Sequence, residues 1–175
     1  DFEKSNNGGA SFNAPFNLTP SGSGNWVTPF LVSRHNGNVL YAGFTRVWKS
    51  TNGGASFAAT STTNLLGGDN IDVLAESPSN PNVLYAGINQ YLFRSTDGGI
   101  TWTQHSGGSG SHVITGIAVD PNDPLHIAVS RSGYVGGQKV YESFNGGQSY
   151  SNISGSLPNI PANAIAFEPG GNNMI

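Results

Sequence analysis

The chain of 175 residues is long enough to bury the core of one domain, and only 10% of its residues are charged. Its net charge is -3 and its seven Lys and Arg are scattered singly, so we expect no binding to nucleic acid. The absence of cysteine excludes disulfides and thiolate metal sites, and no apolar run is long enough to span a bilayer.

The 25 glycines go with a regular pattern of short apolar runs, which favours many tight turns over disorder. We expect neither a metal ion nor a cofactor. The first four residues lack a signal-peptide pattern, so we expect a removed leader or a piece of a longer chain.

Four octets with the pattern Ser-x-Asx-Gly-Gly-x-(Ser/Thr)-aromatic recur along the chain, and their starts are separated by 45, 45 and 48 residues. Their defining positions are Ser5, Asn7, Gly9 and Phe12; Ser50, Asn52, Gly54 and Phe57; Ser95, Asp97, Gly99 and Trp102; and Ser143, Asn145, Gly147 and Tyr150.

Each octet has the chemistry of a self-sufficient hairpin turn. The Asp or Asn side chain can accept hydrogen bonds from later backbone amides, and the paired glycines can adopt the positive φ angles of a tight turn. The hydroxyl groups can bond the remaining backbone groups, and the final aromatic residue is expected to anchor the turn against a neighbouring layer.

Short apolar runs lie between the octets. Val39–Gly43 recurs as Val83–Gly87 and, more weakly, as His126–Ser130, each after a polar turn. The second period therefore predicts four strands, at Ile71–Glu76, Val83–Ile88, Tyr91–Ser95 and Thr101–His105. Four strands in about 45 residues, with no helical periodicity, are typical of one β-propeller blade.

The octets resemble the Asp-box, or BNR, repeat of sialidases, xyloglucanase-type glycoside hydrolases, sortilin-like receptors and a photosystem assembly factor. This resemblance implies an all-β propeller of four-stranded antiparallel blades with Asp-box turns. Asn replaces Asp in three of the four boxes, but Asn can still cap the turn. Residues 139–158 are also similar to blades of large secreted Bacteroidetes proteins, which implies a bacterial, extracellular or cell-surface protein exported by type IX secretion.

The blade pieces are predicted at residues 1–20, 26–62, 69–106, 112–155 and 160–175, which is about four blades' worth. The ends could pair, with Met174–Ile175 beside Phe2–Ser5, and close a four-bladed ring. We favour a fragment of a larger propeller, because the last strand stops after two residues and leaves an exposed edge. The expected partners are the remaining blades, in the same protein or another chain.

Catalytic chemistry has few candidates. A sialidase would need a cluster of arginines, and this chain has four, Arg34, Arg46, Arg94 and Arg131. Arg46 and Arg94 occupy equivalent neighbourhoods before two octets, so we expect them to have a structural role. A glycoside hydrolase needs two opposed carboxylates. Most of the acidic residues lie at turns, with Glu76 and Glu168 aligned to Asp120, and only Asp72, at a strand start, is a weak candidate acid or base.

The remaining polar and aromatic residues give weaker signals. The histidines lack metal-ligand spacing, and Gly107–Ser111 lacks the lysine of a phosphate loop and is predicted to be a flexible linker. Trp26, Tyr91 and Tyr134 lie outside the octets and are weak candidates for stacking on a sugar or contacting a partner. Asn17 and Asn152 begin glycosylation triplets, which matter only in a eukaryotic secreted protein.

We therefore expect a non-catalytic propeller segment of a secreted or cell-surface protein, which scaffolds or binds a protein or glycan partner. The alternative is part of an Asp-box glycoside hydrolase whose active site is completed elsewhere. A third hypothesis, a receptor-like peptide binder, predicts an apolar groove inside the ring.

Overall fold

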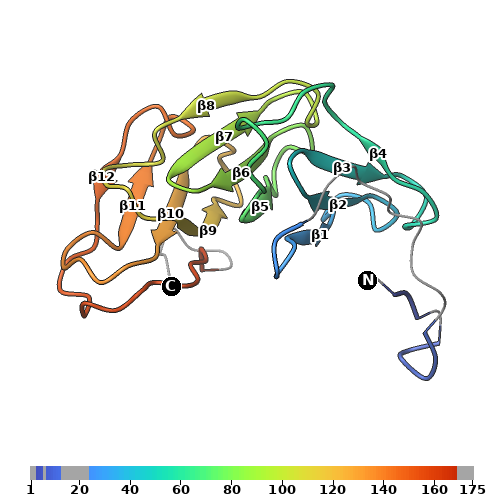
Figure 1. Cartoon of the computed structure of the whole chain (residues 1–175), viewed down its shortest axis with the longest axis horizontal. Coiled ribbons are helices and arrows are strands. Elements are labelled where there is room, and N and C mark those ends of the chain that lie inside the picture. The colour runs from blue at the N-terminus through green and yellow to red at the C-terminus, as the bar shows by residue number, and fades with distance from the viewer. Residues whose placement is uncertain (1–2, 6, 13–23, 169–175) are drawn as a thin grey trace.

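The structure is a computed structural model that describes residues 3–5, 7–12 and 24–168, and its strands form three four-stranded antiparallel sheets. Each sheet is one blade, with its strands in sequence order, and Figure 1 shows the blades side by side in an arc. The strands are β1 (Phe30–Val32), β2 (Leu40–Gly43), β3 (Val47–Ser50) and β4 (Ala58–Ala59); β5 (Val73–Glu76), β6 (Leu84–Ile88), β7 (Tyr91–Ser95) and β8 (Thr103–His105); and β9 (Ile114–Val119), β10 (Ile127–Arg131), β11 (Val140–Ser143) and β12 (Ser151–Asn152).

The described residues contain no helix, and therefore none that could cross a membrane. The second blade has all four strands where the sequence predicts them, although three begin one or two residues later. The predicted first strand is shorter because Ile71 and Asp72 precede β5, yet the amide of Asp72 still donates to the carbonyl of Gly87, at 2.8 Å. The hydrogen-bond ladder thus extends past the end of the assigned strand.

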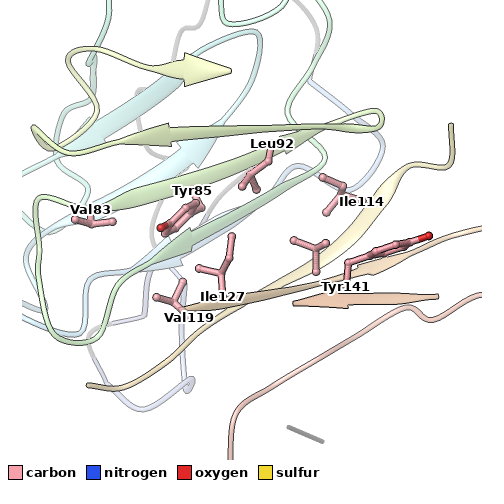
Figure 2. Packing of buried hydrophobic residues seen from close by; sticks show 8 residues of the cluster. Val83, Tyr85, Leu92, Ile114, Val119, Ile127 and Tyr141 are labelled. Carbon is pink, nitrogen blue, oxygen red and sulfur yellow. The ribbon is translucent and has the colours of Figure 1, made fainter. Parts of the chain in front are cut away.

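The hydrophobic core lies between the blades. From the second blade, Val83, Tyr85 and Leu92 face the third blade, where they meet side chains that include Ile127 and Tyr141 (Figure 2). The opposite face of the second blade packs on the first through a second buried cluster of Tyr41, Val47, Ile71, Leu84, Ala86, Ile88 and Phe93. Because alternate residues of β6 supply the two clusters, the middle blade is apolar on both faces and depends on both neighbours.

The last three octets join the third strand of a blade to its fourth, and the turn satisfies its own polar groups as predicted. In the first blade, the amide of Gly54 donates to Ser50 Oγ, at 2.9 Å, and the amide of Ser56 donates to Asn52 Oδ1, at 3.0 Å. Asn52 Nδ2 donates to Ser56 Oγ at 2.9 Å, and the paired glycines Gly53 and Gly54 have φ angles of 68° and 89°. The octets at Asn7 and Asn145 repeat this arrangement, whereas in the third octet the hydroxyl of Thr101 donates to Asp97 Oδ2, at 2.6 Å.

The aromatic residues of the octets differ in their packing. Trp102 and Tyr150 pack against the clusters between blades, and Trp102 Nε1 donates to the carbonyl of Gly99, at 2.8 Å. Phe12 does not follow the expectation of a buried anchor, because its side chain is 60% exposed. The first octet precedes the three complete blades, so no blade described here covers its aromatic ring.

Residues 160–168 lie against the third blade. The amide of Ala162 donates to the carbonyl of Arg131, at 3.1 Å, and Phe167 packs edge-on against His126, with 4.8 Å between ring centroids. Met174 and Ile175, which would pair with Phe2 in the alternative of a closed ring, and the triplet at Asn17 lie outside the described residues.

A candidate ligand-binding rim and an inner cavity

The two ends of each blade carry different loops. The octet turns lie at one end, so the hairpins between second and third strands, and the segments that enter the first strands, lie at the other. We call this second end the loop rim, made of residues 24–28, 69–72, 89–91 and 132–138. All four of the candidate site residues, Asp72, Trp26, Tyr91 and Tyr134, fall on it.

Asp72 fastens two loops of the rim together. Its Oδ1 accepts a hydrogen bond from Asn25 Nδ2, at 2.8 Å, and its Oδ2 accepts one from the amide of Asn89, at 2.7 Å. Asn89 has a φ of 53° in the β6–β7 turn, and its side chain donates to Asp69 Oδ2, at 2.9 Å. Both Asp72 oxygens are therefore engaged with loop donors, as expected of a structural carboxylate.

The three aromatic candidates have different surroundings. Trp26 is fully exposed, at 103% of the reference accessibility, although its neighbour Asn25 is held by Asp72 and by the carbonyl of Ile71. Tyr91 is half-buried and packs on the cluster between the first two blades. Tyr134 is 72% exposed, on the β10–β11 loop of the third blade. The fold thus bonds Asn25, the neighbour of Trp26, to Asp72, while Tyr134 belongs to another blade.

A cavity of 490 Å³ runs along the inner strands β1, β5 and β9. Most of its lining is aliphatic, and the charged residues that line it are Arg34 and Glu76. Both Glu76 oxygens accept hydrogen bonds from the first blade, from Ser33 Oγ at 2.8 Å and from the amide of Arg34 at 2.9 Å. The cavity is a groove lined mainly by aliphatic residues, and the carboxylate that lines it already joins two blades.

The alignment of Glu76 with Asp120 is wrong by one residue. Ser33, Ser77 and Asp120 occupy the equivalent position, because each of their amides donates to the carbonyl at the start of the following strand, at 2.8, 3.0 and 2.9 Å. Each of these residues directly follows the first strand of its blade, whereas Glu76 is the last residue of β5, with its side chain on the face toward the first blade.

Main-chain carbonyls are the partners of three of the four arginines. Arg46 Nη1 lies 3.4 and 3.3 Å from the carbonyls of Ser61 and Thr62 in its own blade. Arg94 reaches across to the next blade, where its Nη1 donates to the carbonyls of Asn145 and Gly146, at 3.0 and 3.2 Å. Both bond main-chain carbonyls, as expected of structural arginines, but their positions are not equivalent, because Arg94 corresponds to Lys49 in the first blade.

The third of these arginines, Arg131, is fully buried and fastens the loop at residues 107–112. Its Nη1 donates to the carbonyls of Gly110 and His112, at 2.9 and 3.1 Å, and its Nη2 donates to the carbonyl of Gly107. Burial lowers the pKa of Arg131 from its ordinary value. The segment Gly107–Ser111, predicted from its glycines to be a flexible linker, is instead anchored on this guanidinium.

Sequence reasoning missed a carboxylate–histidine–carboxylate cluster in the third blade. His126 Nδ1 lies 2.8 Å from Asp120 Oδ2, and its Nε2 lies 2.9 Å from Glu142 Oε1. Burial opposes ionisation of Asp120, but hydrogen bonds from the amide of Asn122 and from His126 outweigh it and lower the pKa of the carboxyl. The available signal was that a histidine stands where the first two blades have Val39 and Val83.

Among the residues that the structure describes, no group of three or more His, Asp or Glu side chains is arranged so that it could hold a metal ion. The histidine cluster thus brings two carboxylates and one imidazole together within the protein's own hydrogen-bond network. Its aromatic neighbour Phe144 stacks on His126, with 4.3 Å between ring centroids and 15° between ring planes.

No protein-family model matches the chain, and no curated protein matches it in sequence. Among solved structures, an ancestral GH74 enzyme matches with 24% identity and a TM-score of 0.66, over 82% of this chain and 20% of its own. The GH74 xyloglucanase from Xanthomonas campestris matches with 20% identity and a TM-score of 0.60, over 83% of this chain and 27% of its own. YCF48 from Cyanidioschyzon merolae matches with 15% identity and a TM-score of 0.52, over 71% and 36%.

These similarities, together with the three four-stranded sheets, identify the fold as part of a β-propeller. The chain spans about a fifth to a third of the length of the structures that it matches, so it corresponds to a few blades of a larger ring.

Proposed function

We propose that the chain is a non-catalytic segment of an Asp-box propeller in a secreted or cell-surface protein, and that its loop rim binds a glycan around Trp26. The observation that carries the proposal is a fully exposed tryptophan beside a fixed anchor, because Asn25 is bonded to Asp72 Oδ1 at 2.8 Å. An exposed aromatic ring on an anchored loop can stack on a sugar with little loss of conformational entropy.

The surrounding polar groups also suit a glycan. Asn89 donates from its side chain to Asp69, at 2.9 Å, and from its backbone amide to Asp72, at 2.7 Å. Amide and carboxylate groups therefore lie on the same rim as Asn25, the residue before Trp26. Sugar hydroxyls donate to and accept from groups of this kind, while the ring face contacts the indole. In this proposal Asp72 supports the loop and does not transfer protons.

Calorimetric titration with a xyloglucan heptasaccharide tests the proposal. Trp26→Ala should weaken binding at least tenfold, equivalent to about 1.4 kcal/mol, since it removes the stacking surface. Tyr134→Ala, which truncates another exposed aromatic residue of the rim, should leave the affinity unchanged. Equal effects of the two changes would contradict a site at Trp26, and so would the absence of binding by the unchanged protein.

The alternative, a part of a glycoside hydrolase, is distinguished by the same ligand. The assay measures new reducing ends on xyloglucan for the unchanged chain and for Asp72→Asn. The proposal expects no hydrolysis by either protein. Hydrolysis that disappears in a folded Asp72→Asn variant would favour the hydrolase.

An apolar peptide in the inner cavity is the second candidate function. Two observations support it. The lining of the 490 Å³ cavity is mostly aliphatic. In addition, a structurally similar protein, YCF48, with a TM-score of 0.50, has a solved structure bound to D1 peptide. A leucine-rich hexapeptide should then bind to the unchanged chain and lose its affinity when Ala75→Lys places a charge in the cavity.

A further inference from the structure

A cationic side chain precedes the first serine in three of the four octets. These residues are Lys4, Lys49 and Arg94, and the fourth position holds Glu142. Arg94 and Glu142 lie on equivalent strands, β7 and β11, one residue before the strand ends. The charge therefore reverses at one position of a structural repeat.

The cations face the octet turn of the next blade. Lys4 Nζ donates to the carbonyl of Gly53, at 3.2 Å, and Arg94 Nη1 donates to the carbonyls of Asn145 and Gly146, at 3.0 and 3.2 Å. Lys49 points the same way, with its Nζ 4.0 Å from where a Cβ on Gly98 would stand. The position thus contacts the following turn each time that such a turn is described.

The space around Lys49 has two halves. A cleft of 380 Å³ is lined on one side by Lys49, Thr51, Ser56 and Phe57, and on the other by residues of the next turn that include Asp97 and Gly98. The third blade has the equivalent of the first half alone, a cleft of 260 Å³ lined by Glu142, Ser143, Phe144, Asn145, Ser149, Tyr150 and Ser151. Within the described residues, no following turn supplies the second half.

Charge complementarity indicates what fits this open half. Lys49 shares its cleft with Asp97, which is the one carboxylate among the four octets. A carboxylate at the Glu142 position cannot donate to turn carbonyls, so it requires a donor instead. His126 Nε2 lies 2.9 Å from one oxygen of Glu142, Oε1, while Nδ1 lies 2.8 Å from Asp120 Oδ2, so two carboxylates share one imidazole, which carries at most one positive charge.

An aromatic face lies beside this carboxylate. Phe144 is exposed, lines the same cleft as Glu142, and takes the place that Thr51 has in the first blade. A carboxylate next to an exposed ring is the pair that receives a guanidinium, through a charge-assisted hydrogen bond and a cation–π contact. Glu142 is 17% exposed, so a bound cation would be partly shielded from water.

We propose that the cleft at Glu142 and Phe144 binds an arginine or lysine side chain of the protein segment that packs against the third blade. The first three junctions join a cation to the neutral or acidic turn of the next blade, and this junction has the opposite polarity. It therefore selects its neighbour, since a further Asp-box turn of the same type would offer Glu142 only carbonyl oxygens.

The test uses the tripeptide acetyl-Gly-Arg-Gly-amide and its uncharged isostere acetyl-Gly-citrulline-Gly-amide. In ¹⁵N-resolved NMR titrations, the arginine peptide should shift the amide signals of residues 142–151 and bind at least tenfold more tightly than the citrulline peptide. Because both titrations use the unchanged protein, the comparison does not depend on how a variant folds.

Two variants and a control locate the site. Glu142→Gln and Glu142→Lys should each abolish the preference for arginine, whereas Asp69→Asn, which removes a carboxylate from the loop rim, should retain it. Equal binding of the two peptides would overturn the proposal, as would arginine-dependent shifts outside residues 142–151. Shifts of the same amides by xyloglucan heptasaccharide without any by the arginine peptide would also overturn it.

Discussion

Replacing Arg94 with methionine tests how the blades are held together. Arg94 Nη1 gives hydrogen bonds of 3.0 and 3.2 Å to two carbonyls of the neighbouring turn, at Asn145 and Gly146. Methionine retains an apolar stem of similar length, so the change removes mainly the charged group. Hydrogen bonds to charged groups contribute about 1.5–3 kcal/mol, and we expect the free energy of unfolding to fall by that amount.

The assay is equilibrium unfolding in urea, followed by circular dichroism and by NMR signals of the third blade. Arg46→Met is the matched control, because Arg46 bonds carbonyls of its own blade at 3.3 and 3.4 Å and joins no two blades. Its cost should be smaller, within about 1 kcal/mol for longer and more exposed bonds. A loss for Arg94→Met no greater than that for Arg46→Met would refute the role of Arg94 between blades.

Three further predictions concern the octet turns and the buried arginine. Hydrogen bonds from Thr101 lower the pKa of Asp97 to about 2. The carboxylate therefore stabilises the fold above pH 3.8, its ordinary pKa, and this stability is lost as the pH falls toward 2. Asp97→Asn should keep the turn at neutral pH and remove this acid dependence, as measured by thermal melts at a series of pH values. In urea titrations, Gly146→Ala should destabilise the fold more than Gly8→Ala. Both glycines have a φ of 68°, but a Cβ on Gly146 would lie 2.0 Å from Arg94 Nη1, whereas a Cβ on Gly8 would meet nothing within 4 Å. Arg131→Met should leave buried carbonyls unpaired and speed hydrogen exchange of the amides at residues 107–112, and unchanged exchange there would show that the guanidinium does not hold the loop.

The sequence was most informative where local chemistry decides the structure. The octets specify their own turns. Within the same eight residues, the serine hydroxyl and the Asx side chain accept hydrogen bonds from backbone amides, and the two glycines adopt positive φ angles. The apolar runs between turn signals predicted the four strands of the second blade to within two residues. These features depend on neighbours along the chain, which a sequence displays directly.

The features that were missed depend on contacts between distant segments. The anchoring of residues 107–112 needs Arg131, about 20 positions later, and nothing in the glycine-rich sequence indicates that partner. The exposure of Phe12 depends on whether a neighbouring blade covers it, and the bonds of Asp72 depend on Asn25 in another loop. The histidine cluster was visible only as a departure from the repeat, where His126 replaces a valine.

The most direct test of the proposed function is one calorimetric comparison on the same protein preparation. Xyloglucan heptasaccharide is titrated into the unchanged chain and into Trp26→Ala, and the sugar is recovered afterwards for reducing-end analysis. The account predicts binding by the unchanged chain, at least tenfold weaker binding by the variant, and intact sugar in both. Equal affinity of the two proteins, or cleaved sugar after incubation with the unchanged chain, would contradict it.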